Sequence, residues 1–387
     1  MKNYFLKSSF VVFMISCFLL FSCSPKQEKK NPVENKKDYR IDFAKGFSIN
    51  TLPSGITIIN VNAPWPDANR TYSYALVKRG MTLPSSLEKR NYDAIIPIPV
   101  ERIIATSTTH IAALEALGVE NSIVGFPDMS YISSKATRKR INKGLIKEMG
   151  KNESLNTELA IELAPDVIFG FSINSQNTIY KTLTQSNIPI VYNGDWTEQT
   201  PLGKAEWIRF FAPFYGLEKK GDSIFQKISK DYELAKTLAL KATKTPTVLS
   251  GALYKDVWYL PGGKSWAAKF IEDANADYIW NKNEDTGSLS LSVESVLEKA
   301  SEADIWISPS QFISYEELGE ANRHYERFKA FKQKKIFTFA NTKGETGGLL
   351  YYEIGPGRPD LVLKDLIHIF HPELLSNYQP YFFKPLE

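Results

Sequence analysis

Residues 218–243 read EKKGDSIFQKISKDYELAKTLALKAT, the longest uninterrupted helical pattern in the chain. Apolar residues recur there every three or four positions, at Ile224, Ile228, Tyr232, Ala235 and Leu238. At a rise of about 1.5 Å per residue, such a helix spans roughly 35–40 Å, the length of a whole domain. A crossover within one compact sheet does not need that length. We therefore predict a rigid helix that joins two separate lobes.

The segments on either side of this helix, residues 101–217 and 244–387, share one pattern: short β-branched runs alternate with helical stretches. Before the long helix we expect strands at 102–105, 122–125, 166–170 and 189–192, and helices near 110–117, 156–163 and 175–186. After it we expect strands at 247–250, 257–260, 304–308 and 335–339, and helices near 265–273, 292–300 and 359–370. The alternation predicts an α/β fold in which each lobe has a mostly parallel sheet covered by helices.

Residues 39–100 have a different pattern and form a β-rich N-terminal extension. Strand-like residues 47–50 and 56–61 flank a Pro-Ser-Gly turn, which is typical of a hairpin. Further extended segments are expected at 72–77 and 95–100. No helical pattern interrupts them.

The chain begins with the pattern of a secretory signal peptide. Lys2 and Lys7 give a short basic start, and residues 8–21 are apolar apart from three serines. The run ends in the letters LFSC, which resemble a lipobox, where the sulfur of the cysteine receives a lipid. We predict that residues 1–22 are removed and that Cys23 carries the lipid anchor. The alternative is an ordinary signal peptide in which Cys23 is incidental.

Residues 23–38 contain almost nothing that a protein core could bury. This composition predicts a disordered tether between the lipid and the folded part. The second cysteine, Cys17, would be removed with the signal, so the mature chain could form no internal disulfide. That is consistent with export to an oxidising compartment.

Composition excludes one class of partner and favours another. The chain has 47 Lys and Arg against 43 Asp and Glu, and it is close to neutral once the signal is removed. No basic stripe stands out, so we expect no nucleic-acid partner. Aromatic residues make up 13% of the chain, and many lie near Gly and Pro, which suits a ligand cleft.

Several short strings, in this order and at these separations, resemble one family. They are RIIA at 102–105, LGV at 117–119, LAPDVI at 163–168, PGGKSW at 261–266 and SVESVL at 292–297. Over residues 101–370 the chain resembles the periplasmic binding proteins that carry iron siderophores, haem or cobalamin to ABC importers. The ending at 357–373 is similar to a lipoprotein branch of that family in Bacteroidetes-type bacteria.

The resemblance implies two lobes on one long helix with a ligand between them, a monomer, no enzymatic activity and no cofactor. It also implies an ABC permease and its ATPase as partners, and a location at the periplasmic face of a membrane, anchored at Cys23. In this family one glutamate near the tip of each lobe docks on the permease, and the matching positions are Glu158 and Glu294. Each also lies in the first turn of an expected helix, where the helix dipole alone favours a carboxylate.

Loops at one end of each sheet should supply the ligand contacts. In the first lobe the candidates are Ser107, Thr108, Tyr131, Phe171 and Trp196. In the second lobe they are Tyr254, Trp258, Trp266, Lys343, Tyr351, Tyr352 and Arg358. Some have structural alternatives: Ser107 suits a helix N-cap, and Arg358 suits the helix start that follows it. Trp258 and Tyr259 alternate on a strand, so one should enter the core and the other should be exposed.

The sequence leaves the cargo open, but the resemblance, since iron chelates are frequent cargo in this family, and the charges near the cleft favour an iron chelate. Lys255, Lys264, Lys343 and Arg358 lie in or beside second-lobe loops and favour an anionic iron chelate, a ferric siderophore. Cobalamin, which is nearly neutral, or haem are the alternatives. Haem would require an axial His or Tyr, and His110 falls within an expected helix, where a structural role is the simpler interpretation.

Two other classes lack their usual motifs. Free-metal capture needs clustered ligands, but the chain has four histidines and no His-rich loop; His368 and His371 are followed at once by Pro372. An exported enzyme is the other class. We find no Gly-x-Ser-x-Gly motif, and the glycine-rich stretch 344–348 matches neither a P-loop nor a dinucleotide-binding motif.

Overall fold

The computed structural model describes residues 37–82, 84, 91–175 and 177–387. The predicted signal peptide, Cys23 and most of the predicted tether lie outside these residues. Within the described part, no helix combines the length and the apolarity that crossing a membrane requires. Two predicted tether residues, Lys37 and Asp38, are in strand β1 (Lys37–Tyr39), which pairs with β2 (Phe47–Thr51). The tether prediction is wrong for these two residues, because backbone pairing does not require apolar side chains.

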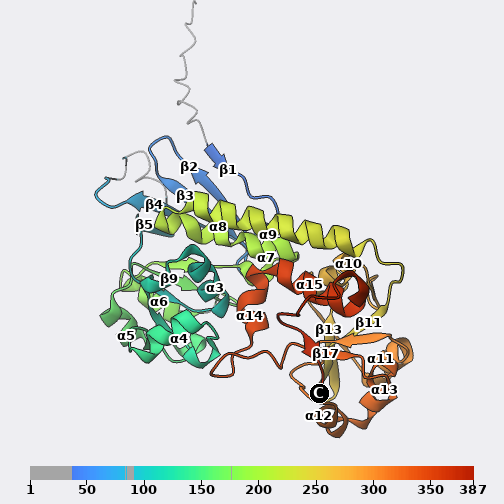
Figure 1. Ribbon diagram of the computed structural model, residues 1–387. Helices are drawn as coiled ribbons and strands as arrows, with labels where there is room; N and C mark the ends of the chain where they lie inside the picture. The colour runs from blue at the N-terminus through green and yellow to red at the C-terminus, as the bar shows by residue number, and fades with distance from the viewer. Residues whose placement is uncertain (1–36, 83, 85–90, 176) are drawn as a thin grey trace, which may run out of the picture. The chain divides into compact units, whose positions relative to one another are not determined.

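The predicted long helix is α9 (Glu218–Ala239), and it links two hydrophobic cores (Figure 1). Its first half buries Phe225 and Ile228 in a core shared with the first lobe, and its second half buries Tyr232 and Ala239 in the core of the second lobe. The connecting role is confirmed. The helix ends four residues before the predicted end, and Leu240, just beyond it, is exposed.

The first lobe is built on a five-stranded parallel sheet in the order β10-β9-β6-β7-β8. Its strands are β6 (Ile103–Ala105), β7 (Ile123–Phe126), β8 (Lys147–Glu148), β9 (Val167–Gly170) and β10 (Ile190–Tyr192). Its helices are α3 (Thr108–Leu117), α4 (Lys135–Asn142), α5 (Thr157–Leu163), α6 (Thr178–Gln185), α7 (Pro201–Glu206) and α8 (Ile208–Phe211).

The second lobe has a similar main sheet in the order β14-β11-β16-β17-β18, parallel except for the last strand. Its strands are β11 (Thr247–Ser250), β14 (Asp277–Tyr278), β16 (Ile305–Ile307), β17 (Ile336–Thr338) and β18 (Lys384–Pro385). A small antiparallel sheet, which the sequence did not predict, consists of β12 (Ala252–Tyr254), β13 (Val257–Pro261) and β15 (Ser288–Leu291). The helices are α10 (Trp266–Asp273), α11 (Val293–Ala300), α12 (Tyr315–Ala321), α13 (Lys329–Lys332), α14 (Leu350–Ile354) and α15 (Pro359–Phe370). Two α/β lobes of mostly parallel sheet are therefore confirmed.

The β-rich extension is a further five-stranded sheet that shares its core with the first lobe. It consists of β1, β2, β3 (Thr57–Asn62), β4 (Thr71–Lys78) and β5 (Ala94–Ile98), hydrogen-bonded in that order. Phe47 and Tyr74 of the extension belong to the same buried cluster as Phe169 and Phe210 of the first lobe. Trp207 and the phenylalanines of the segment 208–214 join the two parts, although the sequence pattern had not singled out this segment.

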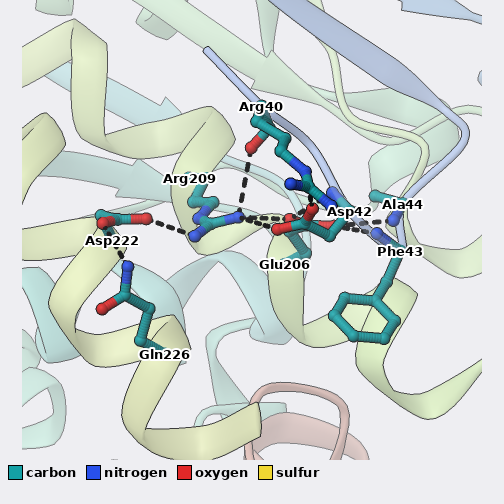
Figure 2. A network of polar contacts seen from close by, with 8 residues as sticks. All are labelled: Arg40, Asp42, Phe43, Ala44, Glu206, Arg209, Asp222 and Gln226. Atoms are coloured by element: carbon teal, nitrogen blue, oxygen red, sulfur yellow. Dashed lines mark hydrogen bonds and ion pairs between the residues drawn. The ribbon is translucent and has the colours of Figure 1, made fainter.

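Buried carboxylates also hold the extension in place (Figure 2). Glu206 is fully buried and accepts hydrogen bonds from the backbone N–H groups of Asp42, Phe43 and Ala44 at 2.7–2.9 Å. It also pairs with Arg209 at 2.6 Å, and the guanidinium of Arg209 reaches Asp222 on α9. One ionic network therefore ties the start of the extension to α7, α8 and the linking helix.

Candidate ligand-binding site

A cavity of about 840 Å³ is lined by the extension, the first lobe and the second lobe. We call it the aromatic cavity, because its lining includes the rings of Trp65, Trp196, Tyr254, Tyr259, Trp266, Phe270, Phe339, Tyr351, Tyr352 and Phe383. Ligand pockets in proteins are commonly of this size and apolar character.

A second cavity, of about 420 Å³, shares Tyr352 with the first. We call it the polar cavity, because hydroxyl, carboxyl and amide groups line much of it: Thr106, Ser107, Thr108, Asp128, Asn152 and Gln311. Residues of both lobes contribute to it. A ligand that enters both cavities would meet ring faces in one and hydrogen-bonding groups in the other.

The aromatic wall is built from a stack of rings in the second lobe. Ser265 caps α10 by accepting a hydrogen bond from the Ala268 N–H, so Trp266 occupies the first position of the helix. The ring of Trp266 stacks on Tyr351 at 6.2 Å between centroids, and Tyr351 stacks on Phe339 at 4.5 Å with only 8° between the planes. Burial raises the pKa of Tyr351, so its hydroxyl stays neutral.

Strained backbone lies in both cavity walls. Asp128 in the polar cavity, and Ser308 and Ser310 in the aromatic cavity, have φ between 49° and 53°. Residues other than glycine seldom adopt this left-handed conformation, which costs about 1–3 kcal/mol and occurs preferentially at ligand sites. The strained positions therefore support the assignment of this region as the site.

The lining carries little charge. Among the described residues that line the two cavities there is no Lys or Arg, and Glu198 and Asp128 are the acidic ones. The Glu198 carboxylate accepts hydrogen bonds from the N–H groups of Lys45 and Gly46 and from Trp207 Nε1. Lys204, behind this wall, donates from Nζ to the carbonyl oxygens of Asp195 and Trp196. The walls offer ring faces and neutral polar groups.

Most of the predicted ligand residues do line a cavity. Ser107, Thr108 and Tyr131 line the polar cavity, and Trp196, Tyr254, Trp266, Tyr351 and Tyr352 line the aromatic one. Ser107 occupies the N-cap position of α3, but its side chain makes no capping hydrogen bond and instead contacts the Thr109 hydroxyl at 3.0 Å. Whether these residues contact a ligand remains a prediction.

The prediction that Trp258 faces the ligand is wrong. Its side chain is fully buried, stacks on Trp306 and donates from Nε1 to the Ser250 carbonyl oxygen at 3.1 Å. The neighbouring Tyr259 faces outward and lines the aromatic cavity. The expected alternation is confirmed, and Tyr259, not Trp258, is the one of the two that lines the cavity. Phe171 is not among the lining residues; its ring packs against Trp196 at 5.7 Å and supports that residue.

The predicted cationic residues do not lie at the cavities either. Arg358 forms a bidentate ion pair with Asp360, at 2.9 and 2.8 Å, at the start of α15. Its role is therefore at the start of this helix. Lys343 is exposed beside a backbone bridge to Leu349. Neither lines a cavity, and neither do Lys255 and Lys264. The charges that favoured an anionic cargo therefore lie outside the cavity walls.

Glu158 and Glu294 are both exposed, in the first turns of α5 and α11. Neither makes an ion pair with another described residue. Glu294 borders a surface groove with Glu298, Arg327 and Lys332. Both carboxylates are therefore accessible to a partner.

The histidines have structural positions. His110 is fully buried in α3, both of its ring nitrogens lack hydrogen-bond partners, and burial lowers its pKa to about 4. The position of His110 is thus structural, as expected, but its ring makes no hydrogen bond to another described residue. The His371 ring nitrogen Nε2 lies 3.0 Å from the Ala274 carbonyl oxygen. In the described part of the chain, no group of three or more His, Cys, Asp or Glu side chains is arranged to hold a metal ion.

The two lobes meet at a hydrogen-bonded contact beside the polar cavity. Glu353 on α14 is buried and accepts hydrogen bonds from the N–H groups of Ser133 and Ser134 at 2.5 and 2.9 Å. The glycine-rich stretch approaches the same segment: a side chain at Gly348 would lie 2.1 Å from the Tyr131 carbonyl oxygen. These glycines therefore permit close contact between the lobes.

This contact predicts that the stability of the folded protein depends on pH. Burial, together with the nearby Glu115, raises the pKa of Glu353 to about 7, although the two N–H donors oppose the shift. The folded protein holds this proton more tightly than the unfolded chain, so protonation of Glu353 stabilises the fold. This stabilisation is complete below the ordinary pKa of about 4.5 and is lost as the pH rises through 7. We expect wild type to lose about 3 kcal/mol relative to Glu353→Gln between pH 4.5 and 7.5, as measured by urea unfolding. Parallel stability curves for the two proteins would show that Glu353 does not titrate in this way.

The chain is similar to a known protein family and to individual proteins. A model of a family described as periplasmic binding protein matches residues 103–342. An uncharacterized lipoprotein of Methanocaldococcus jannaschii is 31% identical over 298 residues, which cover 75% of this chain and 69% of that protein.

Solved structures show the same fold at low sequence identity. A possible iron-binding periplasmic solute-binding protein from Staphylococcus epidermidis matches with a TM-score of 0.55 and 21% identity, over 70% of this chain and 99% of that one. A periplasmic haem-binding protein from Roseiflexus, solved in its apo form, matches with a TM-score of 0.54 and 20% identity, over 71% of this chain and 99% of that one.

Proposed function

The chain belongs to the periplasmic binding protein family, whose members are solute-binding proteins of ABC importers and not enzymes, and on that premise we propose that it carries a bulky metal chelate of low net charge. The best candidate is cobalamin. The single observation behind this choice is the lining of the aromatic cavity, which includes ten aromatic residues and no Lys or Arg among the described residues.

Charge separates the candidate cargoes. An anionic ferric siderophore, or haem with its two carboxylates, would lose hydration in these cavities without gaining a cationic partner, and burying an unpaired charge is costly. Cobalamin has a broad corrin ring that suits aromatic faces, and peripheral amides that suit the hydroxyl and amide groups of the polar cavity. The siderophore prediction rested on the frequency of iron chelates as cargo in the family and on four cations, and these cations do not line the site.

We also propose that the protein delivers its cargo to a membrane permease. The lipid on Cys23 and the tether would hold the protein at the periplasmic face of the membrane, and the M. jannaschii relative is itself named a lipoprotein. Glu158 and Glu294 are exposed carboxylates on different lobes. They would dock on cationic pockets of the permease, because exposed charge pairs favour rapid, correctly oriented encounters.

Native mass spectrometry of the purified lipoprotein would test the cargo. The protein is offered equal concentrations of cyanocobalamin, ferrioxamine B, haem and ferric enterobactin. We expect one bound equivalent of cyanocobalamin to dominate the spectrum, and Trp266→Ala to reduce it strongly. A matched control is Tyr381→Ala, which removes an exposed ring that lines neither cavity.

The other outcomes are also informative. Preference for ferrioxamine B, a ferric siderophore without negative charge, would keep the low-charge argument and replace cobalamin as the cargo. Preference for ferric enterobactin or haem would contradict the proposal.

A further inference from the structure

The N-terminal extension contributes directly to the aromatic cavity. The connection between β3 and β4 carries three lining residues, Ala63, Trp65 and Pro66. On the same side, the described part of the first lobe contributes residues 196–199. The family model begins at residue 103, so the extension loop lies outside the shared family region. Part of the cavity wall is therefore particular to chains that have this extension.

The loop is packed firmly against the first lobe. Trp65 is buried, and its ring meets the edges of Tyr72 and Tyr192 at 5.6 and 5.2 Å between centroids. The Pro64 carbonyl oxygen accepts a hydrogen bond from Trp196 Nε1 at 3.1 Å. A side chain at Gly194 would come within 3.0 Å of Pro64 Cα, so the two segments are in close contact.

The rest of the extension is attached at a second place. The Glu206 carboxylate accepts hydrogen bonds from the backbone N–H groups of residues 42–44 (Figure 2). The Glu198 carboxylate accepts hydrogen bonds from the next two N–H groups, those of Lys45 and Gly46. Glu198 itself lines the aromatic cavity. The same residue thus joins the extension to the cavity wall, and the loop is positioned by buried polar contacts as well as by packing.

From these contacts we infer that the loop at residues 63–66 is part of the cargo site and limits the size of the chelate that the aromatic cavity accepts. This inference rests on the proposed function. Trp65 is the buried anchor, whereas Ala63 and Pro66 are exposed and would contact the cargo. Proline suits such a wall, because its ring is rigid and apolar and loses little entropy when a ligand binds.

A pair of matched substitutions tests the inference in the full-length lipoprotein. Pro66→Trp places a large ring where the loop lines the cavity, whereas Asn69→Trp places the same ring at an exposed position of the loop that lines neither cavity. We expect Pro66→Trp to weaken cyanocobalamin binding at least tenfold and Asn69→Trp to change it less than twofold. If wild type binds cyanocobalamin and both variants bind equally well, the inference is overturned and the proposed function stands.

A second measurement does not depend on the cargo. Pro66→Cys or Asn69→Cys is combined with Ala267→Cys, a lining residue on α10 of the second lobe, and treated with a bis-maleimide that can span the cavity. We expect efficient cross-linking from position 66 and little from position 69. This result would support the loop as a cavity wall even if no chelate in the panel bound, in which case the proposed function alone would fail. Equal yields from both positions would overturn the inference.

Discussion

Replacing Glu158 and Glu294 together by alanine is expected to reduce import of the cargo to background while its affinity for the protein stays unchanged. Both side chains are exposed, lie on different lobes and are separate from the residues that line the two cavities. Their loss should therefore affect the encounter with the permease and leave the ligand site intact. Uptake of labelled cobalamin into cells and calorimetric binding to the purified protein measure the two quantities separately.

The matched control removes Glu233 and Glu316, which are exposed carboxylates on α9 and α12 and lie outside the surface groove that Glu294 borders. We expect this double variant to retain most of the uptake. Undiminished transport by the Glu158→Ala, Glu294→Ala protein would show that these residues merely favour the starts of their helices through the helix dipole. Equal loss in both double variants would indicate a general need for negative charge.

Glu206→Ala is expected to have the largest effect on stability. The substitution leaves three backbone N–H donors and the Arg209 guanidinium without their shared acceptor in a buried site (Figure 2). Each buried donor left without an acceptor typically costs about 1–3 kcal/mol, so the three N–H groups account for most of an expected loss of about 3–5 kcal/mol. Arg209 loses one carboxylate partner but keeps Asp42 and Asp222. Urea unfolding of the purified protein should show this loss, and limited proteolysis should release the extension first.

Glu206→Gln is the conservative comparison, since it retains one acceptor oxygen, and it should lose less stability than Glu206→Ala. Asp231→Ala removes an exposed carboxylate that pairs with Lys227 at 2.7 Å on α9. Exposed pairs contribute at most about 1 kcal/mol, so this control should be nearly neutral. A similar small effect from Glu206→Ala would mean that the network in Figure 2 does not hold the extension.

Local sequence patterns predicted much of the fold. The three- and four-residue spacing in 218–243 indicated α9, and the alternating runs located seven of the ten strands in the two main sheets. They missed the two-residue strands β8, β14 and β18, and the predicted strand at 257–260 belongs to the small antiparallel sheet. The patterns could not indicate that the extension shares a core with the first lobe, because Phe47 and Phe210 are far apart in sequence. The role of Glu206 was equally hidden, since its partners at residues 42–44 are backbone groups.

The site was predictable where a residue lies in or beside a loop at the cleft. Trp266, Tyr351 and Tyr352 were expected in loops and instead lie in the first turns of α10 and α14, where all three line the aromatic cavity. Sequence spacing does not tell which of two alternating strand residues faces the core, and so Trp258 was chosen instead of Tyr259. Nor does it tell that Arg358 pairs with Asp360 two residues later. The extension loop carries no motif, and only its packing brings it to the cavity.

Isothermal titration calorimetry of the purified protein with cyanocobalamin tests the central claim most directly. We expect one site with a dissociation constant below about 1 µM, which corresponds to a binding free energy near −8 kcal/mol. We also expect a large loss of affinity in Trp266→Ala and none in Tyr381→Ala. Absence of saturable heat with cyanocobalamin, together with tight binding of ferric enterobactin, would contradict the claim that this cleft selects a chelate of low net charge.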